Sequence, residues 1–192
     1  MKSPSTAASW AASESRVKSG IIILSELRAP LSERVLTIQR KWDPKLARAA
    51  NPHLTITGSS GMGPIATSTP LEELRAALEP IARETAPMTL VFQKPIKFMQ
   101  SNVVVLPLDP NGPIRALHER IKKSGLRFEQ ERFTFTPHVT LSFFRELNAV
   151  AIEQLLAVRI ADPVVIDHFS VHRTVSITDS RQLLDFPLGG AS

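Results

Sequence analysis

Apolar and polar residues alternate with a period of two in two short segments of the chain. The first is 51–57, Asn-Pro-His-Leu-Thr-Ile-Thr, and the second is 136–142, Thr-Pro-His-Val-Thr-Leu-Ser. This alternation predicts two half-buried strands, on which residues i and i+2 share a face. Each strand is therefore expected to place a histidine, a threonine and a further hydroxyl on one face, and apolar side chains on the other. The two segments repeat one pattern, and His138 lies 85 positions after His53.

The spacing of apolar residues elsewhere predicts a mixture of helices and strands. Apolar positions three to four residues apart predict four helices, at 30–50 with a break at Pro44, from Pro70 onward, at 114–124 and at 149–160. Short apolar or β-branched runs predict strands at 20–27, 88–92, 96–99, 102–108, 164–177 (one strand or two) and 183–188, and a strand region carrying the second histidine over 128–144. Because helices separate single strands and strand pairs, the fold class is predicted to be α+β, with two similar lobes.

The bulk composition favours a soluble globular protein. A chain of 192 residues with 43% hydrophobic and 21% charged residues suits one domain. Its longest apolar runs are far shorter than a membrane span, so no membrane partner is expected. The first 19 residues are rich in Ser and Ala and lack the apolar core of a secretion signal. We therefore expect a disordered tail over 1–19, a single domain over 20–192 and a cytoplasmic location.

Cysteine content and charge narrow the chemistry. The chain has no cysteine, which excludes disulfides and thiolate catalysis. Its net charge of +5 and pI near 10 weakly favour a polyanionic partner such as RNA or a nucleotide. A merely basic surface explains the charge equally well.

Two imidazoles with neighbouring hydroxyls suit the cleavage of a phosphodiester. Such a reaction needs a base for the attacking oxygen, an acid for the leaving oxygen and donors for the non-bridging oxygens. His53 and His138 can be base and acid, because the histidine pKa lies near neutrality. Thr55 and Thr140 can be the donors. One such motif alone is usually structural, but its duplication favours a functional site. This chemistry requires no metal and no cofactor, and none is predicted.

These motifs resemble the signature of the two-histidine phosphoesterase superfamily, also called the 2′-5′ RNA ligase or cyclic phosphodiesterase family. The signature is two His-x-Thr/Ser-apolar motifs, matched here at 53–56 and 138–141, and the resemblance extends over about 20–188. It implies a bilobal fold of two pseudo-symmetric halves, with antiparallel sheets that face a central groove and helices outside. It implies an enzyme whose catalytic residues are His53, Thr55, His138 and Thr140. The implied substrate is a 2′,3′-cyclic phosphate or a 2′-5′ linkage, in an RNA end or a small nucleotide.

Four further residues are predicted to bind the substrate. Thr57 and Ser142 are the remaining hydroxyls on the histidine faces of the two strands. Phe144 is in phase with His138 and can stack on a base. Arg145 takes the place of an arginine that members of this family often carry two positions earlier. Strict alternation would point Arg145 to the core, so we expect a bulge or a strand end before it if it binds phosphate.

Several alternatives remain open at the level of sequence. The same fold could be a non-catalytic RNA- or nucleotide-binding module, or a hydrolase of another small cyclic phosphoester. The pattern does not assign acid and base between the two histidines, nor distinguish hydrolysis from ligation. His118 is predicted to face solvent on its helix, and His168 and His172 to share a strand face in packing roles or in the groove. We expect the protein to be a monomer.

Overall fold

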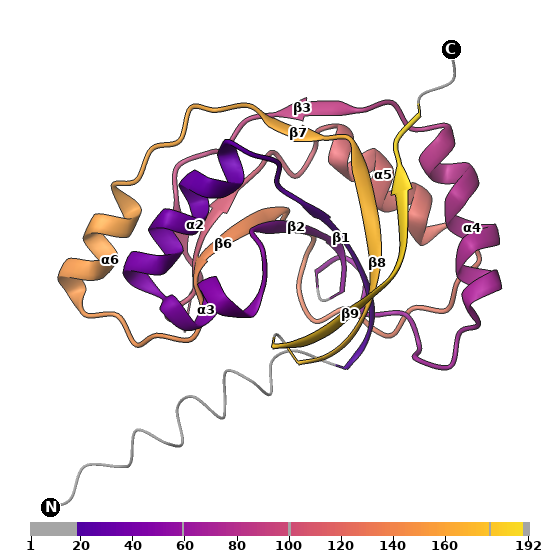
Figure 1. Ribbon diagram of the computed structural model, residues 1–192, viewed down its shortest axis with the longest axis horizontal. Helices are drawn as coiled ribbons and strands as arrows, with labels where there is room; N and C mark the ends of the chain where they lie inside the picture. The colour runs from indigo at the N-terminus through magenta and orange to yellow at the C-terminus, as the bar shows by residue number, and fades with distance from the viewer. Residues whose placement is uncertain (1–18, 59, 100, 177, 190–192) are drawn as a thin grey trace, which may run out of the picture.

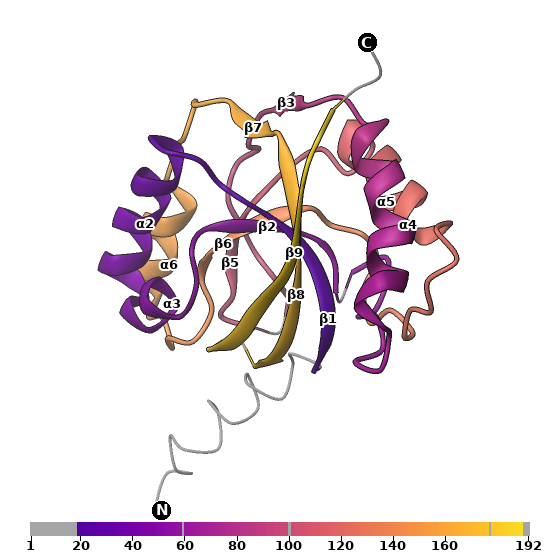
Figure 2. The ribbon, with the colours of Figure 1, turned by 45° about the vertical axis from the view of Figure 1, so that its right-hand side comes forward.

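The computed structural model describes residues 19–58, 60–99, 101–176 and 178–189 (Figure 1). The predicted disordered tail at 1–19 lies outside these residues except for Ser19. A strongly curved antiparallel sheet runs through the middle of the molecule, and helices gather on two sides of it, as Figures 1 and 2 both show. None of the helices within the described part of the chain has the length and apolar character needed to cross a membrane.

Seven antiparallel strands form the main sheet, in the order β4-β5-β6-β2-β1-β8-β9. Their bounds are β1 (Gly20–Glu26), β2 (His53–Thr57), β4 (Ile96–Lys97), β5 (Val104–Pro107), β6 (His138–Ser142), β8 (His168–Ser176) and β9 (Asp179–Pro187). A second, two-stranded antiparallel sheet pairs β3 (Met88–Leu90) with β7 (Val164–Ile166). The two strands that carry the histidine motifs, β2 and β6, are therefore neighbours at the centre of the main sheet.

The described part of the chain contains five helices, which form two groups. Their bounds are α2 (Leu31–Trp42), α3 (Pro44–Ala49), α4 (Leu71–Arg83), α5 (Pro113–Lys122) and α6 (Ala149–Leu156). In both views α2, α3 and α6 lie on one side of the sheet strands, and α4 and α5 lie on the other (Figures 1 and 2). Predicted caps and stops explain several ends: the Asn148 side chain accepts a hydrogen bond from Ala151 N at 2.8 Å, and Gly125 follows α5 with a φ of 86°.

The chain contains an internal structural repeat. The order β1-α2-β2-α4-β3 recurs as β5-α5-β6-α6-β7, with α3 as an addition to the first copy. Leu54 of β2 pairs with Val139 of β6, and these residues occupy the same position in the two motifs. Thr89 of β3 likewise pairs with Val165 of β7. The two similar halves that the sequence predicted are thus confirmed, and antiparallel pairing at β2–β6 joins their strands into one sheet.

The core lies between one face of this sheet and the helices. Leu54 and Ile56 of β2, and Val139 and Leu141 of β6, are all at most 1% exposed. They contact helical residues such as Val35 in one continuous apolar cluster. Each such side chain contributes roughly 1.5–3 kcal/mol on burial. The apolar residues of the two motif segments therefore face the core, as their alternation predicted, and the imidazoles lie on the opposite face of the sheet.

One predicted strand region is shorter than expected, and another is resolved into two strands. The second histidine strand begins only at His138, because Phe128 and Phe133 make isolated bridges to Ile65 and Ser60 instead of extending it. The region over 164–177, for which one strand or two remained open, forms two strands separated at Asp167, where the chain leaves the small sheet and enters the main one. Period-two patterns do not decide this, because they cannot reveal a change of partner strand.

Candidate active site

His53 and His138 lie on adjacent strands and next to each other's threonine. The register in which Leu54 faces Val139 places His53 opposite Thr140, and Thr55 opposite His138. Side chains opposite each other on antiparallel strands have Cβ atoms about 4.5–5.5 Å apart. Each imidazole therefore neighbours the hydroxyl of the other motif as well as that of its own, and all four side chains are partly exposed.

Backbone carbonyls fix both imidazoles in the same way. His53 Nδ1 lies 2.7 Å from the Asn51 carbonyl oxygen, and His138 Nδ1 lies 2.6 Å from the Thr136 carbonyl oxygen. A carbonyl can only accept, so Nδ1 carries the hydrogen in both rings. The Nε2 atoms then hold the lone pair of the neutral rings, and each is available to accept or donate one proton.

Burial lowers the pKa of both histidines. For His53 the hydrogen bond to Asn51 and the charge of Glu26 partly oppose this effect. For His138 the bond to Thr136 opposes it, while the charge of protonated His53 lowers the pKa further. The two rings therefore influence each other, and a proton on one disfavours a proton on the other. The pair is thus suited to a state with one neutral and one protonated imidazole.

Thr57 and Ser142 are not on the imidazole face. The register of each motif strand with its neighbour shifts at a β-bulge, so that Thr57 pairs with Ile23 and Ser142 with Val104. Both hydroxyl-bearing residues are fully buried, and their side-chain oxygens have no hydrogen-bond partner. The prediction that they contact substrate therefore does not hold in this structure. Strict alternation misplaced them because it cannot anticipate a bulge.

Phe144 and Arg145 lie beyond the end of β6, next to the corner between α2 and α3. The Phe144 backbone N–H donates to the Asp43 carboxylate at 2.7 Å, and Lys45 Nζ lies 4.2 Å from the centre of the Phe144 ring. The Arg145 guanidinium lies 3.5 Å from the Trp42 carbonyl oxygen. The strand end that Arg145 requires is thus present. Substrate binding by these two residues stays a prediction.

Two residues that the sequence did not single out lie beside the histidines. The Phe98 ring packs edge-on against His138, with ring centroids 5.1 Å apart and an interplanar angle of 88°. Glu26 is the register partner of His53 on β1, and its carboxylate accepts a hydrogen bond from the Asn51 side chain at 3.3 Å. No sequence motif identifies either residue. Each lies beside a histidine that is far away in the sequence, Glu26 through strand pairing and Phe98 through a ring contact.

His118 is buried, so the prediction that it faces solvent is wrong. It is 1% exposed, its Nδ1 donates to the Ile56 carbonyl at 2.8 Å, and its ring stacks on Phe135 at 3.9 Å between centroids. A Cβ atom at Gly61, whose φ is +72°, would clash with the His118 ring. His118 therefore links α5 to the end of the first motif strand, and the glycine at position 61 leaves room for its ring.

His168 and His172 project from β8 and are largely buried. His168 Nδ1 lies 2.7 Å from Asp167 Oδ1, and His172 Nε2 lies 2.9 Å from Ser170 Oγ. Burial lowers the pKa of His172, the charge of Glu26 raises it, and His53 lowers it again. Over the ranges that the structure describes, no group of three or more His, Cys, Asp or Glu side chains is arranged to hold a metal ion.

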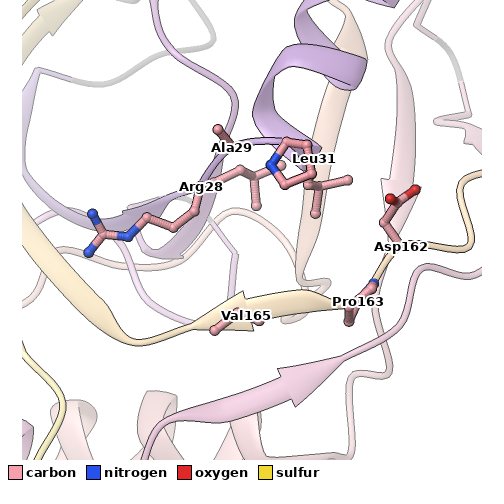
Figure 3. Close-up of a pocket in the computed structure, with 8 residues that line it drawn as sticks. Arg28, Ala29, Leu31, Asp162, Pro163 and Val165 are labelled. Atoms are coloured by element: carbon pink, nitrogen blue, oxygen red, sulfur yellow. The ribbon is translucent and has the colours of Figure 1, made fainter.

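A small pocket of about 190 Å³ lies apart from the two motifs, beside the connection from β1 to α2 (Figure 3). Its lining is mostly apolar and consists of Leu27, Arg28, Ala29, Pro30, Leu31, Asp162, Pro163 and Val165. Its two charged groups are engaged, since Arg28 contacts Asp167 at 3.2 Å and Asp162 contacts Arg34 at 2.8 Å. Neither His53 nor His138 lines it, so we place the candidate site at the motifs.

Comparison with known proteins identifies similarities in sequence family and in fold. Residues 27–176 match the family model of the 2′-5′ RNA ligase superfamily. A protein of Bacillus pumilus named "Putative phosphoesterase" is 28% identical over 127 residues, which cover 66% of this chain and 70% of that protein.

Solved structures share the fold at low sequence identity. The protein TT0787 of Thermus thermophilus has a TM-score of 0.62 and 17% identity, and the match covers 90% of this chain and 99% of that one. Escherichia coli LigT in apo form has a TM-score of 0.56 and 16% identity, with coverage of 89% and 98%. LigT has also been solved in complex with 3′-AMP, at a TM-score of 0.52, 20% identity and coverage of 88% and 98%.

Proposed function

Because the chain belongs to the 2′-5′ RNA ligase superfamily, we propose that it is a metal-independent phosphodiesterase acting on 2′,3′-cyclic phosphate or 2′-5′ phosphodiester bonds of RNA ends or nucleotides. The observation that carries the proposal is the arrangement of the two motifs. His53 and His138 lie on adjacent strands, each with Nδ1 fixed by a carbonyl and each with a threonine of the other motif opposite.

This arrangement supports general acid–base catalysis at one phosphorus atom. The Nε2 atom of one neutral imidazole takes a proton from water as the water oxygen bonds to phosphorus. The Nε2–H of the other, protonated imidazole gives its proton to the ribose oxygen as the bond from phosphorus to that oxygen breaks. Thr55 and Thr140 donate to the non-bridging oxygens, where negative charge increases. One imidazole gains a proton from water and the other loses a proton to the ribose oxygen. Proton exchange with solvent then restores the starting protonation state of the two histidines.

Charge and ring contacts support a nucleotide substrate. The net charge of +5 favours an anionic ligand, and the Phe98 ring beside His138 offers a surface on which a base can stack. LigT, which shares the fold, has been solved with 3′-AMP. We therefore expect an RNA end with a 2′,3′-cyclic phosphate, or a small nucleotide, to occupy the face around His53 and His138.

The test is turnover of 2′,3′-cyclic nucleotides and of a 2′-5′ dinucleotide in the presence of EDTA. We expect His53→Ala and His138→Ala each to lower kcat/KM by about 10³-fold, since each removes a proton-transfer group. Thr55→Val and Thr140→Val are each expected to lower it by about 10²-fold, through loss of one donor to the developing charge. Thr89→Val is the matched control, because Thr89 is exposed on β3 in the small sheet.

Two outcomes would replace the proposal. Binding of 3′-AMP without turnover of any of these diesters would indicate a nucleotide-binding module on the same fold. Turnover confined to another cyclic phosphoester, still dependent on both histidines, would keep the chemistry and change the substrate.

A further inference from the structure

The structural repeat is broken at one position beside the two histidines. On β1, Glu26 is the register partner of His53. On β5, the strand equivalent to β1, the register partner of His138 is Pro107. The same place in the two halves therefore holds a carboxylate in one and an apolar ring in the other. Two imidazoles that are fixed in the same way consequently lie in different electrostatic surroundings.

Asn51 links the carboxylate to the imidazole. Its carbonyl accepts from His53 Nδ1 at 2.7 Å, and its side-chain amide donates to Glu26 Oε2 at 3.3 Å. In the second half, the carbonyl of Thr136 has the same role at 2.6 Å from His138 Nδ1. The Thr136 hydroxyl instead donates to the Thr134 carbonyl at 3.2 Å. Among the described residues, the first motif thus has a side chain that holds a carboxylate close to the imidazole, and the second motif does not.

The other charged groups around His53 do not cancel this difference. His138 on β6 and His172 on β8 interact with His53, and both are themselves disfavoured as cations by its charge. Asp185 on β9 acts on His172. Among the groups that the structure describes, Glu26 is the carboxylate whose charge raises the pKa of His53.

We propose that Glu26 is a positioning residue that keeps the catalytic proton on His53, so that the first motif supplies the general acid and His138 the general base. The proposal rests on the phosphodiesterase function proposed above. Water loses a proton to His138 Nε2 as its oxygen bonds to phosphorus. The ribose oxygen leaves phosphorus and takes the proton from His53 Nε2, and solvent exchange returns a proton from His138 to His53.

The position of the proton can be tested by kinetics, because only the enzyme form with the proton on the general acid is active. A pair that holds one proton has two forms, with the proton on His53 or on His138, and Glu26 favours the first. We expect Glu26→Gln to lower kcat/KM at its pH optimum by about two- to fivefold, the range of a partly exposed charge pair. Asp185→Asn, which also converts a carboxylate to an amide, is expected to leave kcat/KM unchanged. An increase in Glu26→Gln would overturn the proposal, because it would make His53 the base.

NMR titration separates this inference from the question of turnover. The Cε1 proton signals of His53 and His138, assigned with the two alanine variants, report each pKa in the free protein. We expect the higher pKa at His53 and a decrease at that ring in Glu26→Gln. A higher pKa at His138, or no response of His53 to Glu26→Gln, would overturn the proposal. Absence of turnover in the wild type would instead contradict the proposed function, and the titration would still decide where the proton resides.

An activated substrate gives an independent readout of the acid. The nitrophenolate of bis(4-nitrophenyl) phosphate leaves without a proton, so a missing general acid matters less for this diester. We expect His53→Ala to lose at least tenfold less activity on it than on a 2′,3′-cyclic nucleotide, whereas His138→Ala loses similar factors on both. The reverse pattern would assign the acid to His138 and overturn the proposal.

Discussion

At the scale of single residues, neighbouring groups fix the orientation of the two imidazoles and lower their pKa values. A carbonyl two positions earlier holds Nδ1 in each, which leaves Nε2 as the reactive atom. Burial lowers the pKa of His53 and of His138, so the neutral form persists to lower pH than in an exposed histidine. A general base requires a fixed orientation and a neutral, proton-accepting form at the working pH, and a lowered pKa favours that neutral form.

These pKa directions predict an acidic optimum. In the proposed mechanism the productive state has one neutral and one protonated imidazole, so kcat/KM is expected to fall below the lower pKa and above the higher one. Since burial lowers the pKa of both rings from 6.5, we expect a bell-shaped profile with its maximum below pH 6.5. The measurement is kcat/KM across pH 4 to 9 at constant ionic strength. A flat profile, or a maximum above about pH 7.5, would contradict paired imidazoles of lowered pKa.

A repeated pattern in the sequence predicted which residues lie together, whereas residues whose position depends on tertiary pairing could not be predicted; the catalytic roles stay a prediction. His53, Thr55, His138 and Thr140 stood out because one arrangement occurs twice, and the structure brings them together. Glu26 reaches the site only through the pairing of β1 with β2. A carboxylate at the end of an apolar strand carries no local sign that its neighbour across the sheet is a histidine.

At the scale of elements, the corner between α2 and α3 holds the end of the second motif strand. Asp43 is 1% exposed; its Oδ1 accepts from Leu46 N at 3.1 Å and caps α3. Its Oδ2 accepts from the backbone N–H groups of Phe143 and Phe144 at 2.7 Å each. One carboxylate thus satisfies a helix start and two donors beyond β6.

We expect Asp43→Ala to lower the free energy of unfolding by about 3 kcal/mol, because one buried and two partly buried N–H groups lose a charged acceptor. Urea unfolding followed by circular dichroism measures the change. Asp162→Asn is the control: its ion pair with Arg34 is at the surface and contributes less than about 1 kcal/mol. Equal effects of the two variants would show that the Asp43 contacts do not stabilise this corner.

The link between α5 and β2 predicts a loss of stability in acid. Burial lowers the pKa of His118, which donates to the Ile56 carbonyl. The unfolded state, with a histidine pKa near 6.5, then binds the proton more readily, so stability decreases as pH falls below about 6.5. We expect His118→Gln, which cannot be protonated, to lose less stability than the wild type between about pH 6.5 and 5.

Urea midpoints at about pH 8, where the histidine is neutral in both states, provide the internal reference for this comparison. Parallel loss of stability in the two proteins below pH 6.5 would show that His118 does not titrate on unfolding. Sequence alone suggested the opposite environment for this residue. A histidine between Leu117 and Glu119 on an amphipathic helix gives no indication that its side of the helix meets a strand carbonyl.

The sequence predicted the ends of helices better than the ends of strands, because capping residues mark helix ends locally. Asn148 caps the start of α6, and α5 ends at Lys122, shortly before Gly125 with its positive φ. The limits of β6 and β8 depend on which strand lies alongside, and the region predicted over 128–144 is much longer than β6.

At the scale of the whole molecule, a helix of each half packs against the motif strand of the other half. The first-half helix α2 contacts β6 of the second half, and the second-half helix α5 contacts β2 of the first. The strands β3 and β7 also pair between halves. The sequence predicted two similar lobes. The way each half covers the other depends on contacts between residues far apart in the chain, such as Gln39 with Thr140 and His118 with Ile56, which are 101 and 62 positions apart. No local pattern encodes such contacts.

This packing between the halves predicts that neither half is stable alone. Each fragment, for example 20–99 or 102–189, would expose the apolar face of a motif strand that the other fragment's helix covers, around Leu54 in one and Val139 in the other. Small units that bury too little apolar surface do not overcome the entropy of folding. We expect both fragments to show little helix by circular dichroism, and the full chain to unfold in one transition with coincident circular dichroism and Trp42 fluorescence.

An equimolar mixture of the fragments makes the expectation specific. If the halves fail alone because each lacks the other's helix, mixing should restore helical signal and dispersed amide resonances in proportion to complex formed. The proposed catalytic site would return with it, because the pairing of β2 with β6 brings His53 and His138 together. A fragment that folds cooperatively alone would show instead that each half has a sufficient core, and that the central strand pair joins two independent units.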